Sequence, residues 1–165
     1  MKKIQAFENS KVTLTDSYYL NATNKVVKNI LSLDADRLLM GFRENAVLMY
    51  QSKKDNPEIP LCKIPDFYKG KFRYGGWENT LIAGHTLGHY LTALAQACEN
   101  EAVSQDDRNA CKEACDYSVA QLKVCQDMTE GTKYEGLVFA GTLPDQNFRD
   151  NPDMQFTNVE HRKSD

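Results

Sequence analysis

Two short motifs, Tyr-Gly-Gly-Trp-Glu at residues 74–78 and Gly-His-Thr-Leu-Gly-His-Tyr at residues 84–90, are the most informative part of this sequence. They contain the single tryptophan and two of the three histidines of the chain. If residues 78–98 form one helix, five polar side chains fall within a narrow sector: Glu78, His85, His89, Thr92 and Gln96. A sector that merely faces water usually carries lysines and glutamates, so this composition indicates a functional face.

The opposite sector of the same helix is apolar. It consists of Leu87, Leu91, Leu94 and Cys98. Side chains of this kind at helical spacing form a packing face. The periodicity therefore predicts a helix that is buried on one side and presents a polar site on the other.

Two helices are predicted before this one. Residues 18–31 have helical apolar spacing, and Asp16 or Ser17 can cap their start. Asp34 is a plausible N-cap for the next helix, whose apolar positions are Leu38, Leu39, Phe42, Val47 and Leu48. We expect the two helices to pack together as a hairpin.

A fourth helix is predicted after residue 104. Ser104 and Asp107 approximate a capping box at its start. One stripe of this helix should be buried: Cys111, Cys115, Ser118, Leu122 and Cys125. Because cysteine packs readily as a small hydrophobe, we interpret these thiols as core residues and not as metal ligands or nucleophiles.

The rest of the chain shows little periodicity. Pro57, Pro60 and Pro65 interrupt residues 51–76, which should form a long loop at the rim of a site. Residues 142–165 should form an open polar tail. The 165 residues fit one domain.

Composition excludes some classes of function. A net charge of −3 gives no support to nucleic-acid binding. No secretion signal and no apolar run of membrane-spanning length is present, so we expect a cytoplasmic chain without a membrane partner. The five cysteines should then be reduced.

The two histidines allow three interpretations. Their i, i+4 spacing suits a metal-binding helix, but Thr86 stands where the zinc protease motif has glutamate, and no third ligand is obvious beyond Glu78. They could instead be buried and bonded to backbone carbonyls, with Gly84 and Gly88 allowing close packing. The third interpretation, which we favour, is a sugar pocket in which Glu78, His85 and His89 bind hydroxyl groups and Trp77 stacks on the ring.

No acid/base pair can be proposed from spacing. Asp34, Asp36 and Arg37 lie close together in sequence, but carboxylates in a first helical turn are better explained by capping and by the helix dipole. The sequence therefore offers no catalytic residue.

Several separate motifs resemble one known family. They are Leu-Asp-Ala-Asp-Arg-Leu-Leu at 33–39 with Phe42-Arg43, the two motifs quoted above, Leu122 with Cys125-Gln126, and Gln-Phe-Thr-Asn-Val-Glu at 155–160. Their order and spacing are similar to those of the amino-terminal part of the beta-L-arabinofuranosidases, glycoside hydrolase family 127 and close relatives. The resemblance extends from about Val12 to the end of the chain.

This resemblance implies a mainly α fold, the amino-terminal portion of an (α/α)6 barrel whose inner helices face a central sugar pocket. Family members are understood to use a cysteine nucleophile held by zinc, with further cysteine and glutamate ligands and a glutamate as acid/base. None of the five cysteines of this chain matches those motifs, so we expect no metal ligand, cofactor or catalytic residue here, and zinc only in the full-length enzyme.

We therefore expect residues 1–165 to be a single partial domain, an amino-terminal fragment of a glycoside hydrolase acting on arabinofuranosyl-type bonds and inactive by itself. Substrate-binding residues would be Trp77, Glu78, His85 and His89, and the partner a carbohydrate. Uncovered helix faces should favour self-association. The alternative is a non-catalytic carbohydrate-binding or structural helical module.

Overall fold

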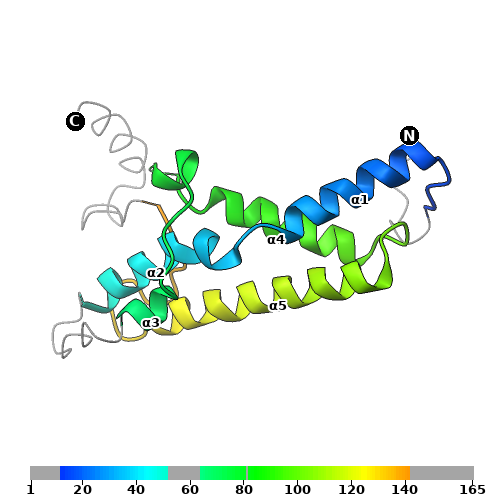
Figure 1. Ribbon diagram of the computed structural model, residues 1–165. Helices are drawn as coiled ribbons and strands as arrows, with labels where there is room; N and C mark the ends of the chain where they lie inside the picture. The colour runs from blue at the N-terminus through cyan, green and yellow to red at the C-terminus, as the bar shows by residue number, and fades with distance from the viewer. Residues whose placement is uncertain (1–11, 52–63, 81, 142–165) are drawn as a thin grey trace, which may run out of the picture.

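The computed structural model describes residues 12–51, 64–80 and 82–141, and within them the chain is helical and without strands (Figure 1). The elements are α1 Ser17–Leu31, α2 Ala35–Gln51, α3 Ile64–Tyr68, the 3-10 helix η3 Gly76–Asn79, α4 His85–Cys98 and α5 Gln105–Asp127. The prediction of a mainly helical chain is confirmed. No helix in these ranges is long and apolar enough to cross a membrane. Most of the proline-rich stretch and the predicted polar tail lie outside the described residues.

Side chains expected to cap helices do so at three helix starts. The Asp16 carboxylate accepts from the Tyr18 amide at 2.8 Å, and the Asp34 carboxylate accepts from the Asp36 amide at 3.0 Å. The Ser104 hydroxyl accepts from the Asp107 amide at 3.2 Å. Each bond satisfies a backbone N–H that has no partner within its helix. Local sequence therefore fixes where α1, α2 and α5 begin.

The longest helix, α5, connects the two ends of the molecule (Figure 1). α4 and α5 form a helical hairpin, while α2 also packs on α5 and carries α3 beside it. α1 packs on α4 and α5. The predicted hairpin of the first two helices is wrong, because α1 packs on α4 and α5 and does not lie along α2, although its Val27 shares the core with Leu39 of α2.

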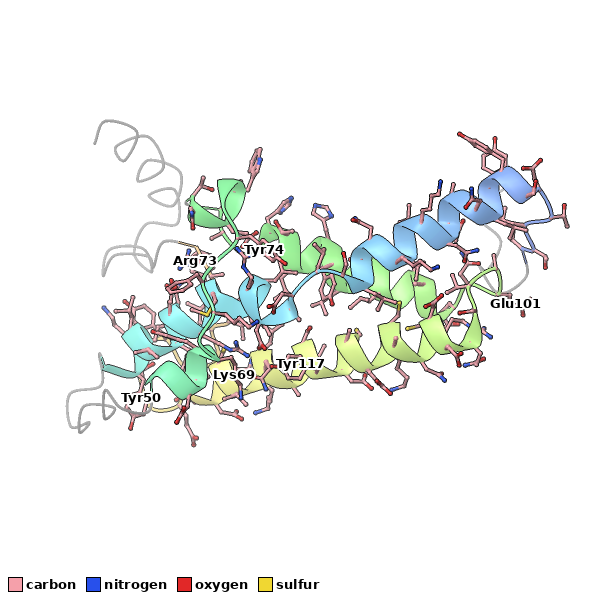
Figure 2. All side chains as sticks on the ribbon, viewed as in Figure 1. Tyr50, Lys69, Arg73, Tyr74, Glu101 and Tyr117 are labelled. Atoms are coloured by element: carbon pink, nitrogen blue, oxygen red, sulfur yellow. The ribbon has the colours of Figure 1, made fainter. Side chains whose placement is uncertain are left out.

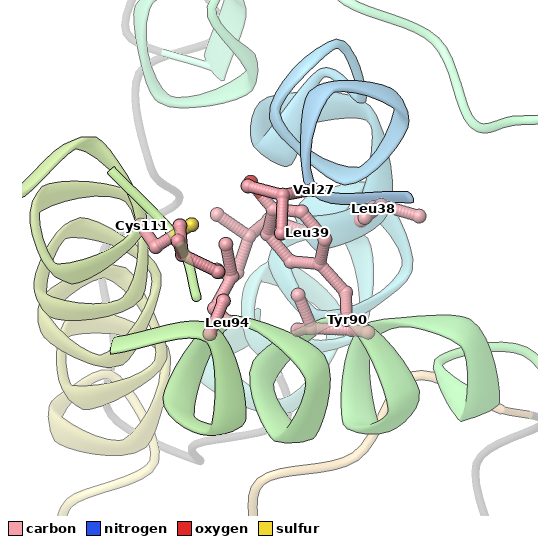
Figure 3. Close-up of a cluster of buried hydrophobic side chains, with 9 residues drawn as sticks. Val27, Leu38, Leu39, Tyr90, Leu94 and Cys111 are labelled. Carbon is pink, nitrogen blue, oxygen red and sulfur yellow. The ribbon is translucent and has the colours of Figure 1, made fainter. Parts of the chain in front are cut away.

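A single core joins four of the helices. Figure 3 shows Val27 of α1, Leu39 of α2, Leu94 of α4 and Cys111 of α5 converging on one cluster. Leu39, Leu94 and Cys111 are completely buried. Removing such residues from water is the main term that holds the helices together, about 1.5–3 kcal/mol for each large apolar side chain.

The predicted faces of the last two helices are largely confirmed. Leu87 and Leu94 of α4 are buried and Leu91 is partly buried, as expected for the packing side. On α5, Cys111, Ser118 and Cys125 are buried. On α2, by contrast, Leu48 is 53% exposed although its spacing predicted a packing position.

Two predicted boundaries are wrong. The third helix does not extend over residues 78–98, because Glu78 lies in η3 and α4 begins only at His85. Gly84 before it has φ of +91°, a left-handed conformation that interrupts a helix and that glycine adopts without strain. The predicted loop also contains α3. Pro65, which has no backbone N–H, is tolerated in the first turn of this helix because N–H groups there make no helical hydrogen bond.

Candidate functional site

Residues of α2 hold the segment that leads into the first motif. The Arg37 guanidinium donates to the Phe72 carbonyl at 3.1 Å and to the Arg73 carbonyl at 3.3 Å. It also stacks on the Tyr74 ring, 3.9 Å from the ring centroid. The Tyr74 hydroxyl in turn accepts from the Asp34 amide at 2.9 Å. Arg37 therefore has a structural role here, which the capping interpretation of the neighbouring carboxylates did not specify.

Asp34 links the same segment electrostatically. Its carboxylate forms an ion pair with Lys71 at 2.8 Å. Burial opposes ionisation of this carboxyl, but the hydrogen bond and charge of Lys71, with the Arg37 and Asp36 amides, outweigh it and lower its pKa. The charged form of Asp34 therefore stabilises both the start of α2 and the segment beside it.

A second link comes from Arg73. Its guanidinium forms an ion pair with Glu44 of α2, the Nε atom lying 2.7 Å from the carboxylate. The same guanidinium donates to the Glu78 carbonyl at 3.2 Å. Figure 2 shows Arg73 and Tyr74 on the strand-like connection between α3 and η3. This pairing holds η3 close to α2.

Glu78 is 4% exposed and binds the start of α4. One carboxylate oxygen accepts from the Gly84 amide at 2.9 Å and the other from the Thr86 amide at 3.2 Å. These amides flank His85: Gly84 is the N-cap of α4, and Thr86 lies in its first turn, where N–H groups have no helical partners. A negative charge there also interacts favourably with the helix dipole. Both oxygens of Glu78 are thus occupied by the backbone, and the residue does not share the exposed face of α4.

The two histidines of α4 are exposed and touch each other. Their Nε2 atoms are 3.0 Å apart, and the rings meet edge to face with centroids 4.5 Å apart. The interpretation of buried histidines bonded to backbone carbonyls is therefore wrong. Thr92 and Gln96, further along the helix, are also exposed. The expected polar face exists, formed by His85, His89, Thr92 and Gln96 without Glu78.

Trp77 lies in η3 and is 67% exposed. An indole left in water by a folded chain offers a flat apolar surface for a ligand or another protein segment. η3 packs against α4, which places the tryptophan on the element next to the two histidines. Trp77, His85 and His89 are thus exposed side chains on two elements that pack together.

Close packing at Gly84, which the sequence suggested for both glycines of the motif, fixes the entry into α4 through partners that the sequence did not specify. A methyl group at Gly84 would lie 2.7 Å from the Ala140 methyl and 2.8 Å from the Phe42 ring. Ala140 is held there because the Asn45 amide donates to the carbonyls of Phe139 and Gly141 at 3.0 and 2.6 Å. A methyl group added at Gly88, which is exposed, would have no atom within 4 Å. Only Gly84 is therefore required for close packing.

Arg43 is the other important residue that sequence reasoning missed. It is completely buried between α2 and α5, paired with Asp36 at 2.6 Å and bonded to the Gln121 amide oxygen at 2.8 Å. Asp36 lies only seven residues earlier on the same helix, but Gln121 on α5 lies 78 residues away, and local spacing does not predict that contact.

The described cysteines are core residues. Cys98, Cys111, Cys115 and Cys125 are free thiols, and burial raises the pKa of Cys125 to about 11. A thiol that remains protonated is a poor nucleophile and metal ligand. Among the residues that the structure describes, no three His, Cys, Asp or Glu side chains could together hold a metal ion. The zinc centre expected of the family therefore does not fit this part of the chain.

Comparison with known proteins identifies the family. Searches against curated proteins and solved structures found no significant match. The family described as beta-L-arabinofuranosidase, GH127 catalytic domain, matches residues 11–161, almost the whole chain. The chain therefore belongs to the GH127 catalytic-domain family and is a glycoside hydrolase domain resembling the beta-L-arabinofuranosidases.

Proposed function

We propose that the exposed side of α4, together with Trp77, forms one wall of a pocket for arabinofuranosyl-type sugars. The observation that carries this proposal is the pair of exposed, touching imidazoles on a helix whose opposite side is buried in the core. Such a helix is rigid, so its polar side chains are held ready for a ligand.

The chemistry of these side chains suits a sugar. Each neutral imidazole offers one N–H donor and one nitrogen acceptor, which complements hydroxyl groups that both donate and accept. The exposed indole of Trp77 can cover the apolar face of a sugar ring. We assign direct sugar contacts to Trp77, His85 and His89. Glu78, with both oxygens bonded to backbone amides, acts by fixing the first turn of α4.

The same helix suits an inner position in an (α/α)6 barrel. Its apolar side packs on α5 and α1, and its polar side is left open. In such a barrel the inner helices turn one side to the outer layer and the other to the central pocket. We propose that α4 is an inner helix, that α5 packs behind it, and that the chain forms an amino-terminal part of the barrel.

The described residues contribute binding and not the bond-breaking step. In the family, zinc would hold a cysteine as the thiolate nucleophile, but among the described residues the four free thiols are grouped with no further ligands. We propose that the 165-residue chain alone does not hydrolyse arabinofuranosides. An assay on aryl arabinofuranosides checks this, and turnover that is abolished by a chelator or by thiol alkylation would contradict it.

Sugar binding is tested with methyl β-L-arabinofuranoside by saturation-transfer NMR and calorimetry. We expect millimolar binding that His89→Ala and Trp77→Ala each weaken at least tenfold. Lys112→Ala, an exposed change on α5, is the matched control and should bind normally. Normal binding by both site variants, or no binding by the unchanged chain, would overturn the proposal. Binding together with turnover by the chain alone would refute only its predicted inactivity.

We also propose that the chain associates with itself through uncovered apolar surface. A groove of about 610 Å³ opens between α1 and α4, and Val26 and Tyr19 at its edge are 57% and 60% exposed. Exposed apolar surface of this kind favours association. Sedimentation velocity at increasing concentration should show dimers or larger species, reduced by Val26→Lys. A strictly monomeric chain at every concentration would contradict this.

A further inference from the structure

We propose that His85 and His89 form a chelating site for a divalent transition metal of the nickel or copper type. This site differs from the zinc–cysteine centre of the family and does not depend on the sugar-binding proposal, although it uses two of the same side chains. It rests on the geometry of the histidine pair.

The separation of the two nitrogen atoms matches a chelate. Imidazole nitrogens bind such metals at about 2.0–2.1 Å, so two ligands at a right angle are about 2.9 Å apart and two at a tetrahedral angle about 3.3 Å. The observed Nε2 separation is 3.0 Å. This separation lies within the range of both arrangements, so the pair can occupy two neighbouring positions around one ion, and Cu(II) and Ni(II) favour such nitrogen ligands.

The surroundings allow the metal to enter. Both rings are exposed, and the torsion that orients an imidazole has a broad minimum, so the rings can rotate to direct both lone pairs at one cation. The hydrogen bond between the rings already requires a lone pair on one Nε2 atom. Water fills the remaining coordination positions, because no third protein ligand is grouped with the pair among the described residues.

The helix holds the pair in place. Residues four apart on a helix lie above one another, whereas in an unfolded chain their separation varies widely. The buried leucines of α4 and the Glu78 carboxylate at its first turn keep this part helical. The metal should therefore bind the folded chain more tightly than the unfolded chain and should raise its melting temperature.

The test uses Ni(II), which thiols do not reduce, on the tag-free 165-residue chain. Calorimetry should show one Ni(II) per chain, and Ni(II) should raise the melting temperature. His85→Gln and His89→Gln should each weaken binding at least tenfold and remove the thermal shift. His161→Gln, which changes the third histidine of the sequence, is the matched control and should leave both unchanged.

Each outcome decides the proposal. Equal binding by the unchanged chain and by the two α4 variants would overturn it, as would loss of binding in His161→Gln alone. The α4 variants must retain the helical circular dichroism of the unchanged chain, which we expect because both rings are exposed. Trp77→Ala separates the two proposals. If this variant loses sugar binding but still binds Ni(II), the metal site is independent of the proposed sugar function.

Discussion

At the scale of the residue, Glu78 shows how a candidate ligand can have a structural role. Its position beside the single tryptophan of the sequence and six residues before the second motif, which begins at Gly84, suggested a ligand contact. In the structure its carboxylate is buried and accepts from two amides of the first turn of α4. A side chain that satisfies two otherwise unpaired N–H groups stabilises the helix that carries the histidines.

Replacing Glu78 should therefore reduce stability. We expect Glu78→Ala to lower the free energy of unfolding by about 2 kcal/mol, because two amides lose a charged acceptor. Glu78→Gln retains one acceptor oxygen and should lose about half as much. Urea unfolding measures both, with exposed Glu99→Gln as the control. Unchanged stability together with lost sugar binding would show that Glu78 is a direct ligand.

Asp34 makes stability depend on pH. Its pKa is lowered from the ordinary value of 3.8 in the folded chain, so its contribution is complete above that value and is lost as the pH falls through the lower, folded pKa. Asp34→Asn should therefore lose less stability between pH 6 and pH 3 than the unchanged chain does. Urea unfolding at the two pH values measures this difference. Asp106→Asn, an exposed change in the first turn of α5, controls for the loss of one negative charge. If the unchanged chain and both variants lost the same stability between the two pH values, the role assigned to Asp34 would be wrong.

At the scale of the element, the start of α4 is fixed by contacts on two sides. Glu78 binds its first amides, and Ala140 fills the space over Gly84. The helix therefore begins directly after Gly84, where the backbone is left-handed and Ala140 packs closely. This start is seven residues later than periodicity predicted. Capping by nearby residues, as at α1, α2 and α5, could be predicted. The cap that Glu78 of η3 supplies to α4, and the contact of Ala140 with Gly84, could not be predicted in this way.

The two glycines of the second motif provide a matched test. Gly84→Ala should destabilise the chain by about 2–4 kcal/mol, since alanine is strained at φ of +91° and its methyl would overlap Ala140. Gly88→Ala should stabilise it by up to about 1 kcal/mol, since the site is helical and open. Thermal and urea unfolding compare the two. Equal effects would refute the proposed packing over Gly84.

At the scale of the whole molecule, α5 links two packing regions. Its first half packs on α4 around the common core, and its second half meets α2 through Arg43. Arg43 is completely buried and its Nε and Nη1 atoms have no partner among the described residues. The Tyr117 hydroxyl donates to the same Asp36 oxygen at 2.5 Å, so Arg43, Asp36 and Tyr117 share one network, in which Arg43 is buried and Tyr117 is 37% exposed.

Breaking this network should be costly. Arg43→Ala should lower the free energy of unfolding by about 3 kcal/mol, because it opens a cavity and leaves Asp36 without its cation. The double change Arg43→Met with Asp36→Asn should recover much of the loss, because methionine fills the space and no unpaired charge remains. Urea unfolding of the single and double variants measures the coupling. Lys123→Ala, which removes an exposed pair with Asp127, should change nothing measurable.

The sequence by itself determined the helical class, three of the helix starts, the buried sides of α4 and α5, and the family, since each depends on local spacing or on short motifs. It also predicted that His85 and His89 lie together on a polar side of a helix whose other side is packed. The tertiary structure decided that α1 packs on α4 and α5 and not along α2, that α4 begins at His85, and that Arg43 is buried. These outcomes depend on contacts between residues distant in the chain, whose partners local periodicity does not specify. For the same reason, Glu78 could be recognised as part of the site but not as the cap that holds it.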